Sequence, residues 1–492
     1  MLKAVDWIYR EADVRALERA HASLQGGDLY PLMAAAARAA FGCLHVHWPM
    51  ARRIVVVCGS GNNGGDGFAL AVLLKADGRH VRVIATAAES QASEARRARQ
   101  DWLSAGGEIE LFDPDLPPPD ADLIVDAIFG IGLNRAPEGV SGAAIQWINA
   151  SSQPVLALDL PSGAMGDTGD CPGVTVTATR TLALIVAKPG HVLGAALNYV
   201  GRLQVDDLDV VVPPSTMRAL QASDLAMWQQ PRPRVSHKGD YGRALILAGA
   251  PGMHGAALLS AGAALRAAPG YVCLCSTDAA VAAALIRHPE VMSTSDHALT
   301  AEWLQRASAV LIGPGIGQGE LGRERFESWW QDFRTTGRPA VVDADALNVL
   351  AQSPRSLSTS VILTPHPTEA ARLLGGSTDS IQRDRLAAAH QLAARFGAII
   401  ILKGAGTVLA HPDGRAAVCL DGNPGMAVAG MGDVLSGLLV GLLAQTRDAW
   451  QCACTAVLVH ARTGDWLLST RGFRNVQPSA MIDHLGAIEV LK

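Results

Sequence analysis

Polar residues follow three short apolar runs in the first half of the chain. The run at 54–58 leads into a glycine-rich segment, Gly59–Gly67, in which Gly59, Gly61 and Gly64 fit the G-x-G-x-x-G pattern of a phosphate-binding loop. A dehydrogenase of the Rossmann type also needs an acidic residue about 20 positions further on. The next strand-like run ends Ile-Ala-Thr, and the first acid after it is Glu89. The simple dehydrogenase interpretation is therefore disfavoured.

The same segment carries carboxamides and a carboxylate, which suit a hard cation. A carboxylate beside a phosphate is repulsive, whereas carboxamide oxygens are good ligands for hard cations. Two further apolar runs end in Asp126 and in Asp159, and Ser162 follows the second of them. Because ligands bind at the carboxyl ends of parallel strands, Asn63, Asp126 and Ser162 are predicted to converge on one oxygen-lined cation site. The alternative for a single Asp at a strand end is a turn or helix cap.

A second glycine-rich segment, 421–437, precedes an apolar helix in the second half. The free backbone N–H groups at such a helix start form an anion site. Asp433 stands at this start, either as a functional carboxylate or as an N-cap. The chain has no G-x-x-x-x-G-K-[ST] sequence, so it is not a P-loop enzyme. We expect the glycines at 59–67, 130–132, 404–406 and 430–432 to let the backbone approach a nucleotide.

Short apolar runs alternate with longer Ala/Leu-rich segments, which is typical of an α/β protein with doubly wound, mainly parallel sheets. A proline-rich stretch at 213–233 marks a domain boundary. The predicted strands lie at 54–58, 81–85, 123–128, 155–160, 181–186, 244–248, 271–275, 309–312, 340–342, 361–363 and 398–402. The helices predicted between them include 68–76, 256–267 and 434–445.

Composition excludes several classes of protein. The 492 residues are 49% hydrophobic and 18% charged, which argues against disorder, and the formal net charge of -5 argues against nucleic-acid binding. The mean hydropathy is +0.19. A membrane-spanning helix needs about 18 consecutive apolar residues, and the chain has no such run. Buried parallel strands explain the hydropathy instead. We expect a cytoplasmic protein with no nucleic-acid or membrane partner.

The motifs GNNGGDG, VDAIFGIG and DLPSG occur in this order and resemble the YjeF N-terminal domain, an epimerase of hydrated NADH and NADPH, over residues 1–215. The resemblance implies a Rossmann-like domain with a potassium ion held by Asn63, Asp126 and Ser162. Epimerisation requires proton transfer, so our hypothesis for Asp159 is an acid/base role, and the alternative is that it only holds ribose hydroxyls. The family often has Asp where Glu18 stands. The implied contacts of the hydrated nucleotide are Asn62, Asn63, Gly64, Gly65, Asp66, Gly130, Ile131, Gly132, Leu133, Asn134, Arg135, Ala136 and Asp159.

Residues 235–492, after a linker at 216–234, resemble the ribokinase-like YjeF C-terminal domain, an ADP- or ATP-dependent NAD(P)H-hydrate dehydratase. The motifs are KGDYG, GPGIG, DADALN, TPHPTE, KGAGT and the G-x-G-D that ends at Asp433. Asp433 would deprotonate the hydroxyl that attacks the phosphoryl group. Without the surrounding motif, His366 reads as a buried, satisfied histidine. The implied hydrate contacts are Ala256, Gly317, His366 and Asp433, and the implied ADP contacts are Lys403, Gly404, Ala405, Gly406, Thr407 and Gly432.

The resemblance implies a two-step repair of the hydrate, with K+ in the first domain and Mg2+ and ADP in the second. Phosphorylation turns a poor leaving group, hydroxide, into phosphate. The expected partners are these small molecules, in a homo-oligomer. One alternative is a ribokinase-like small-molecule kinase fused to a non-catalytic nucleotide-binding domain. Another, non-enzymatic alternative treats the first half of the chain as a binding scaffold.

Overall fold

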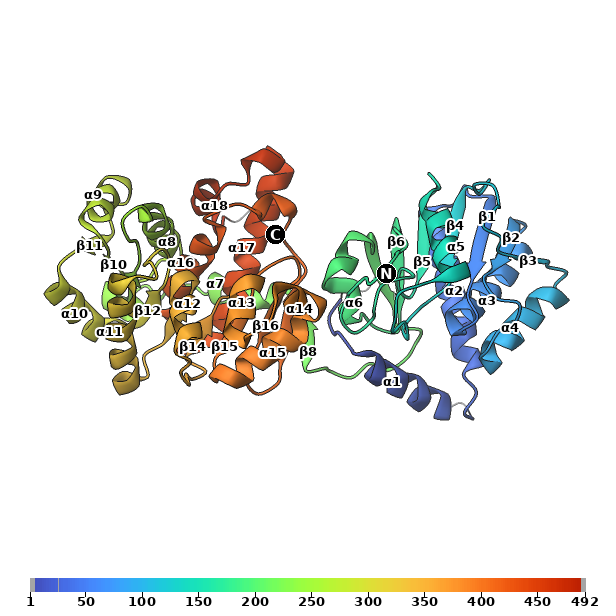
Figure 1. Ribbon diagram of the computed structural model, residues 1–492, viewed down its shortest axis with the longest axis horizontal. Coiled ribbons are helices and arrows are strands. Elements are labelled where there is room, and N and C mark those ends of the chain that lie inside the picture. The colour runs from blue at the N-terminus through green and yellow to red at the C-terminus, as the bar shows by residue number, and fades with distance from the viewer. Residues whose placement is uncertain (1–4, 25, 488–492) are drawn as a thin grey trace. The chain divides into compact units, whose positions relative to one another are not determined.

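The computed structural model describes residues 5–24 and 26–487 and divides the chain into two compact units, Met1–Arg218 and Ala219–Lys492 (Figure 1). We call them the N-terminal and the C-terminal unit. The division falls within 216–234, where we expected a linker. That segment forms three short elements, β8 (Met217–Ala219), η2 (Ala222–Leu225) and α7 (Ala226–Gln229).

The N-terminal unit contains a seven-stranded sheet in the order β3-β2-β1-β4-β5-β6-β7. Every neighbouring pair in it is parallel. The order reverses between β1 and β4, because the chain passes from β1 to β2 and β3 on one side before β4 adds to the other. The strands are β1 (Arg53–Cys58), β2 (His80–Ala85), β3 (Ile109–Leu111), β4 (Leu123–Ala127), β5 (Val155–Leu158), β6 (Arg180–Leu184) and β7 (Arg202–Asp206).

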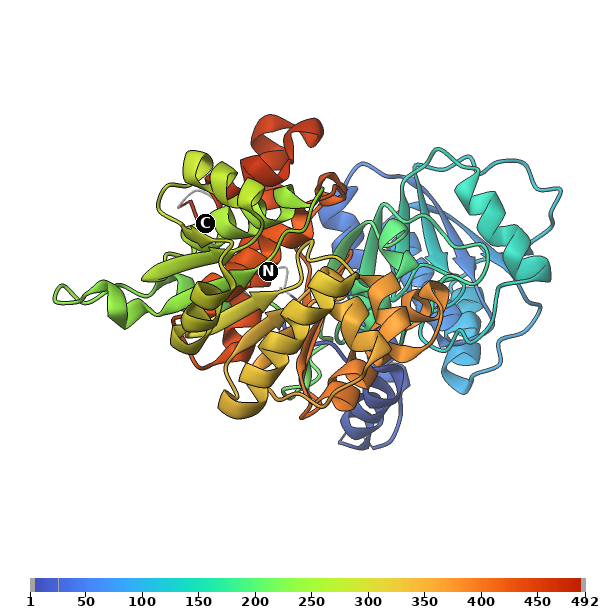
Figure 2. The ribbon, with the colours of Figure 1, turned by 60° about the vertical axis from the view of Figure 1, so that its left-hand side comes forward.

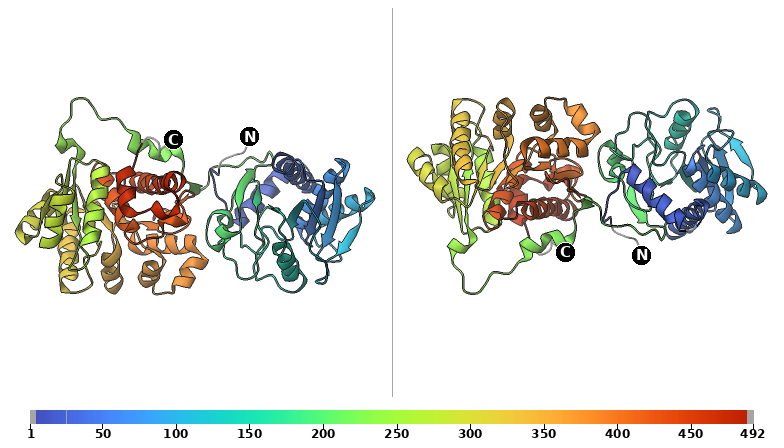
Figure 3. Two further views of the ribbon diagram at one scale, coloured as in Figure 1. Left: turned by 90° about the horizontal axis from the view of Figure 1, so that it is seen from above. Right: turned by 90° about the horizontal axis from the view of Figure 1, so that it is seen from below.

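Helices cover both faces of this sheet, which explains why its strands are apolar throughout. Ile54, Val56 and Cys58 pack into a core formed with α2 and α3. Val55 and Val57, which point the other way, pack against α5. Figure 3 shows the blue helices and the teal helix α5 on opposite sides of the sheet. The helices are α1 (Glu11–Ser23), α2 (Tyr30–His47), α3 (Asn62–Ala76), α4 (Ser93–Ser104), α5 (Gly139–Asn149), α6 (Pro189–Val192) and η1 (Ala195–Asn198).

A ten-stranded sheet in the order β11-β10-β9-β12-β13-β14-β15-β16-β17-β8 forms the centre of the C-terminal unit (Figure 2). Its strands from β11 to β15 are parallel, and β16 is antiparallel to both β15 and β17. The strands are β9 (Arg243–Leu247), β10 (Tyr271–Cys275), β11 (Met292–Thr294), β12 (Ala309–Ile312), β13 (Ala340–Val342), β14 (Val361–Leu363), β15 (Ile399–Leu402), β16 (Thr407–Ala410) and β17 (Ala416–Cys419).

One face of this sheet packs against α8, α16 and α17, and the orange helices α13 and α15 lie on the other (Figure 3). Ile246 belongs to the first face, while Leu245 is equally buried on the second. The helices are η3 (Lys238–Tyr241), α8 (His254–Arg266), α9 (Asp278–Arg287), α10 (His297–Arg306), α11 (Glu320–Thr336), α12 (Ala344–Gln352), α13 (Pro367–Leu374), α14 (Thr378–Arg383), α15 (Arg385–Phe396), η4 (Pro424–Met426), α16 (Met431–Leu443), α17 (Ala449–Arg471), η5 (Phe473–Asn475) and α18 (Pro478–His484).

The α/β prediction and the mainly parallel sheets are confirmed. Each predicted strand is present within a few residues of its expected bounds, whereas β3, β7, β8, β11, β16 and β17 were not predicted. The prediction of a loop at 59–67 is wrong for most of that segment, because α3 already begins at Asn62. No helix in the described ranges is long and apolar enough to cross a membrane.

Candidate active sites at the carboxyl ends of the two sheets

Glycines bring the ends of β1 and β4 together at the point where the strand order reverses. A Cβ atom on Gly59 would lie 2.0 Å from the carbonyl oxygen of Ile128, and one on Gly64 would lie 2.0 Å from that of Gly59. A Cβ on Gly67 would meet the side chain of Ala127 at 2.6 Å. These three glycines are therefore required for packing of the protein against itself, which is a different reason from the approach of a nucleotide that we expected.

Asp126 and Ser162 form a buried pair at this edge. Ser162 donates to the Asp126 carboxylate from its Oγ (2.6 Å) and from its backbone N–H (2.8 Å). The Asp126 carboxylate also accepts from the N–H of Ile128 at 3.2 Å, which is the turn interaction considered as the alternative. Asp126 has no exposed surface, and burial raises the pKa of its carboxyl to about 6 despite these bonds. Among the described residues, no positively charged side chain pairs with this carboxylate.

Asn63 lies beside this pair with its carboxamide unsatisfied. Both the Oδ1 and the Nδ2 of Asn63 are buried without a hydrogen-bond partner. A Cβ on Gly130 would lie 3.4 Å from Asn63 Oδ1 and 3.0 Å from Asp159 Oδ2. The N–H of Phe129, the residue before Gly130, donates to Ser162 Oγ at 2.8 Å. Asn63 and Ser162 thus both adjoin the 129–130 segment, while the convergence of Asn63, Asp126 and Ser162 on one cation stays a prediction.

Asp159 is held in a strained backbone conformation and paired with a buried lysine. Its φ is +61°, in the left-handed region that non-glycine residues rarely adopt. Lys188, 1% exposed, donates to Asp159 Oδ1 at 2.5 Å, and the N–H of Ile131 donates to Oδ2 at 3.1 Å. Burial alone would raise the pKa of Asp159, but Lys188 and the hydrogen bonds hold it below its usual value. Asp159 is therefore ionised at neutral pH.

His191 fixes the backbone of this pair. Its Nδ1 accepts from the N–H of Lys188 at 2.9 Å, so its Nε2 carries the hydrogen and meets the carbonyl oxygen of Asp159 at 2.5 Å. Burial and the nearby Lys188 lower the pKa of His191 to about 4. The imidazole is thus neutral and joins the backbones of Lys188 and Asp159 through hydrogen bonds.

Two more carboxyl groups face Asp159. Burial and the proximity of Asp159 raise the pKa of Glu18 above its usual value, and the same two causes raise that of Asp66 well above it. The helix α1, which carries Glu18, also brings Arg15 to within 2.9 Å of a Cβ built on Gly132. The remaining predicted contacts are Leu133, Asn134, Arg135 and Ala136. Among the described residues, no hydrogen bond joins any of them to Asp159, Glu18 or Asp66.

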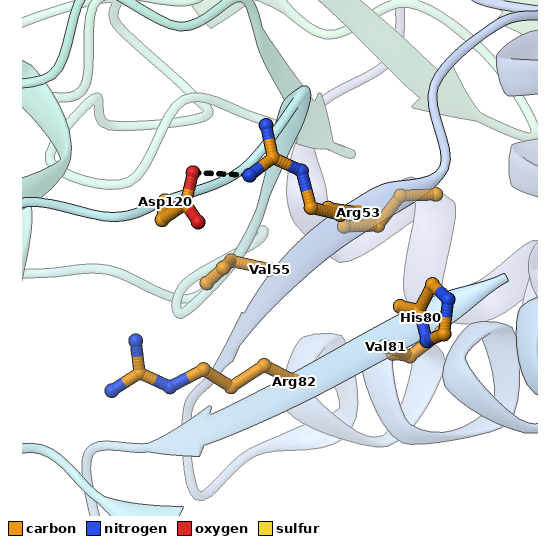
Figure 4. Close-up of a pocket in the computed structure, with 7 residues that line it drawn as sticks. Arg53, Val55, His80, Val81, Arg82 and Asp120 are labelled. Carbon is orange, nitrogen blue, oxygen red and sulfur yellow. Dashed lines mark hydrogen bonds and ion pairs between the residues drawn. The ribbon is translucent and has the colours of Figure 1, made fainter.

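A cavity of the same unit lies elsewhere. Figure 4 shows its lining side chains, which include Arg53, His80, Arg82 and Asp120. Arg53 and His80 begin β1 and β2, so the cavity is at the amino ends of these strands. Arg53 and Arg82 are already paired, with Asp120 and Glu110 respectively. The cavity is therefore unrelated to the polar residues at the carboxyl ends.

In the C-terminal unit, Lys403 brings the ends of β15, β13 and α16 together. Its Nζ lies 2.8 Å from Asp343 Oδ1 and 3.9 Å from Glu369 Oε2. A Cβ on Gly432 would lie 3.3 Å from the same nitrogen. Burial would lower the pKa of Lys403, but the surrounding carboxylates raise it above its usual value. A fixed cation therefore stands at the start of α16.

The start of α16 is open to a ligand. Its N-cap is Gly430, which has a φ of +92° and no side-chain cap. The N–H groups of Gly432 and Asp433 have no acceptor in the described part of the protein. Asp433 lies in the first turn and does not cap the helix, so the N-cap alternative is wrong. Burial and the nearby Asp343 raise the pKa of Asp433 to about 7, which suits a general base.

Three other predicted residues border this edge. The N–H of Gly317 donates to Asp345 at 2.9 Å, and a Cβ on Gly315 would lie 3.3 Å from that of Ala256. The His366 side chain is 46% exposed, so the alternative of a buried histidine is wrong. Its Nδ1 accepts from the N–H groups at the start of α13, and partial burial and the proximity of Lys403 lower its pKa.

Lys188, Asp343 and Glu369 are functional candidates to which we assigned no role from the sequence. Lys188 stands two residues after the run predicted at 181–186, and its position near a strand end was a usable signal. Asp343 and Glu369 stand in motifs that we recognised. Both residues lie near Lys403 only in the folded protein. Asp343 is 60 residues from Lys403 along the chain, so no local pattern reveals this pairing.

Comparisons with known proteins show the family of this chain. A family profile described as NAD(P)H-hydrate dehydratase matches residues 244–486, and one described as YjeF-related protein N-terminus matches 29–190. The bifunctional NAD(P)H-hydrate repair enzyme Nnr of Escherichia coli is 40% identical over 97% of this chain and 92% of its own. Its namesake from Vibrio cholerae is 37% identical over 97% of both chains.

Among solved structures, a ribokinase-like superfamily protein from Enterococcus faecalis is similar to part of this chain. It is 27% identical, with a TM-score of 0.52, and the match covers 56% of this chain and 96% of that one. The C-terminal unit is thus ribokinase-like, and the sequence similarity extends over both units. This chain belongs to the family of bifunctional NAD(P)H-hydrate repair enzymes.

Proposed function

We propose that this chain repairs hydrated NADH and NADPH in two steps. The domain at 1–215 interconverts the R and S epimers of the hydrate. The domain at 235–492 dehydrates the S epimer and converts ADP to AMP and phosphate. The observation that carries this proposal is the partly buried Asp433, whose pKa is about 7, in the first turn of α16 beside Lys403.

In the dehydration step, Asp433 accepts the proton of the substrate hydroxyl as that oxygen attacks the β-phosphoryl group of ADP. The bond from this phosphorus to the oxygen that bridges to the α-phosphate breaks, and AMP leaves. The N–H groups of Gly432 and Asp433 and the ammonium of Lys403 stabilise the transferring charge. The lone pair of the ring nitrogen then expels phosphate, and loss of a proton restores the dihydronicotinamide.

The remaining predicted residues have binding roles in this proposal. Ala256, Gly317 and His366 contact the hydrate, and the turn at 403–407 contacts ADP. Within the described ranges, no three His, Cys, Asp or Glu side chains group as a metal site. Mg2+ would therefore be held chiefly by the phosphates of ADP, whose charge it neutralises.

In the epimerisation step, the ionised Asp159 accepts the proton of the carbinolamine hydroxyl. The ring C–N bond opens to an aldehyde, the nitrogen takes up a proton, and closure on the other face gives the second epimer. Lys188 and His191 keep Asp159 ionised and oriented. The residues Asn62–Asp66 and Gly130–Ala136 would hold the nucleotide around it.

The residues at the β1–β4 junction fit a potassium ion. Asn63 Oδ1 is buried and unsatisfied, and Asp126 is a buried carboxylate with no ion pair among the described residues. Asn63, Asp126 and Ser162 would hold K+, which supplies positive charge beside the anionic nucleotide. The predicted homo-oligomer and cytoplasmic location stay predictions.

The test is to supply hydrated NADH with ADP, and separately with ATP, and to follow the return of the dihydronicotinamide absorbance. We expect both epimers to be repaired with ADP. Repair of one epimer alone would contradict the epimerase assignment. No repair with either nucleotide would contradict the dehydratase assignment and favour the small-molecule kinase.

A further inference from the structure

Arg385 is a buried cation beneath the turn that joins β15 and β16. It is the first residue of α15, and 2% of its surface is exposed. Its Nη2 donates to the carbonyl oxygens of Leu402 and Lys403, at 3.1 Å each, and its Nη1 donates to Gln382 at 2.8 Å. Its Nε is buried without a partner. The guanidinium thus donates two hydrogen bonds to the backbone that enters this turn.

The charge of Arg385 is not neutralised by the protein. None of the ion pairs among the described residues includes it, and burial lowers its pKa to about 10, so it remains cationic at neutral pH. It also stands at the amino end of a helix, where the dipole disfavours a cation. A buried, unpaired charge in this position destabilises the fold. Packing alone would be better served by an apolar side chain, which indicates another role.

The turn above Arg385 presents free amide groups. The N–H groups of Gly404, Ala405 and Gly406 donate to no acceptor in the described part of the chain. Gly404 has a φ of +137°, and a Cβ there would lie 3.0 Å from Arg385 Nη2. The only side-chain bond across the turn, among described residues, runs from Thr407 Oγ1 to the carbonyl of Gly404 at 2.8 Å. Successive free N–H groups in such a turn form an anion-binding concavity.

The direction of one peptide links these two observations. The carbonyl of Lys403 points at the guanidinium, and all peptide bonds of the described residues are trans. In a trans peptide the C=O and N–H groups point in opposite directions. The N–H of Gly404 therefore points away from Arg385, toward the open side of the turn.

We infer that Arg385 is a positioning residue for the anionic nucleotide, which holds the Lys403–Gly406 turn in its binding shape and adds an unneutralised positive charge beneath it. This inference rests on the proposal that ADP binds this turn. It predicts that changes at Arg385 weaken the binding of ADP and leave the binding of the hydrate and the rate of the bound complex largely unchanged.

The experiment compares Arg385→Met and Arg385→Lys with Arg383→Met, a control that removes an exposed arginine two residues earlier. We expect Arg385→Met to raise the KM and the Kd of ADP by about 10-fold or more, as loss of charge-assisted bonds implies. The KM of the hydrate and kcat should change by less than about 3-fold. Arg385→Lys, which keeps the charge without the fork, should lie between the wild type and Arg385→Met.

Two results would overturn the role of Arg385. One is an unchanged affinity for ADP in a folded Arg385→Met protein. The other is a parallel loss of affinity for ADP and hydrate. If Arg385→Met does not fold, Arg385→Lys decides in the same way. Calorimetry measures ADP binding directly, so a wild-type chain that binds ADP without restoring NADH would contradict the proposed function and leave the test of Arg385 intact.

Discussion

The two sites place an aspartate near a lysine at the carboxyl edge of a sheet, yet the pKa of one aspartate is lowered and that of the other is raised. Lys188 contacts Asp159 directly at 2.5 Å and holds the pKa of that carboxyl below its usual value. Lys403 is instead paired with Asp343 at 2.8 Å, and the pKa of Asp433 is about 7. A lysine therefore ionises a neighbouring carboxyl only where no other carboxylate has already neutralised it.

This difference separates the chemistry of the two steps. Asp159, in a strained backbone position, is ionised at neutral pH before the step and holds the substrate proton only during it. Asp433 can take up and release a proton near neutral pH, as a base in phosphoryl transfer must. The following predictions test this contrast, beginning with the largest effect.

The largest expected effect is that of Asp433→Asn on dehydration. Asparagine cannot accept the proton of the attacking hydroxyl, so we expect the ADP-dependent rate to fall by at least about 100-fold. Epimerisation, measured on the same protein by the interconversion of R and S hydrate, should stay at the wild-type rate. Survival of both activities would show that Asp433 is not the base.

Removal of Lys188 should affect both stability and epimerisation. Lys188→Met leaves Asp159 as a buried unpaired charge, which we expect to lower the free energy of unfolding by about 3–5 kcal/mol. Urea unfolding measures this, and the epimerase rate should fall because the pKa of Asp159 rises.

The control is the double variant Asp159→Asn/Lys188→Met, which removes both charges. It should recover most of the lost stability without recovering epimerisation. A double variant as unstable as Lys188→Met would show that lost packing, and not the unpaired charge, is responsible.

The pH dependence of the two activities should differ. Dehydration should fall to half its maximum near the pKa of Asp433, about 7, and decline further as Asp433 is protonated at lower pH. Asp159 itself should add no step to the epimerisation profile between about pH 5 and 8, because it stays ionised throughout that range, so any step near pH 6 would come from Asp126. Rate profiles of the two half-reactions, measured separately, check this. Coinciding profiles would remove the contrast between the sites.

The smallest effect concerns stability. The folded protein keeps the proton of Asp433 up to about pH 7, whereas the unfolded chain releases it near its usual value, so this group lowers stability as pH rises between the two. Asp433→Asn should therefore be more stable than the wild type at about pH 8, by roughly 1–2 kcal/mol, and equally stable at about pH 4. Thermal unfolding at both pH values measures the difference. An equal gain at both would point to better packing instead.

Much of this architecture follows from local sequence. The parallel strands are buried on both faces, so continuous apolar runs such as 54–58 and 361–363 revealed them. The missed strands are short, and several are partly polar: β3 is Ile-Glu-Leu and β7 carries Arg, Gln and Asp. Their pairing at or near the edges of the sheets, and not their composition, makes them strands.

The glycines show where local reasoning stops. A G-x-G-x-x-G pattern does not distinguish a loop that meets a phosphate from one that meets another part of the chain. Only the tertiary structure shows that Gly59 faces Ile128 and that Gly64 faces Gly59. The pattern also gave no sign that α3 starts at Asn62, because glycines are poor helix formers.

The sequence by itself determined the order along the chain of eleven of the strands, the polar residues that end several of them, and the family. The proton states of Asp159 and Asp433 were decided only by the tertiary structure. Each depends on burial and on partners that are distant along the chain, such as Lys188 for Asp159 and Asp343 for Lys403. Electrostatic interactions act through space in a low-dielectric interior, so the pKa of a carboxyl is a property of the folded neighbourhood.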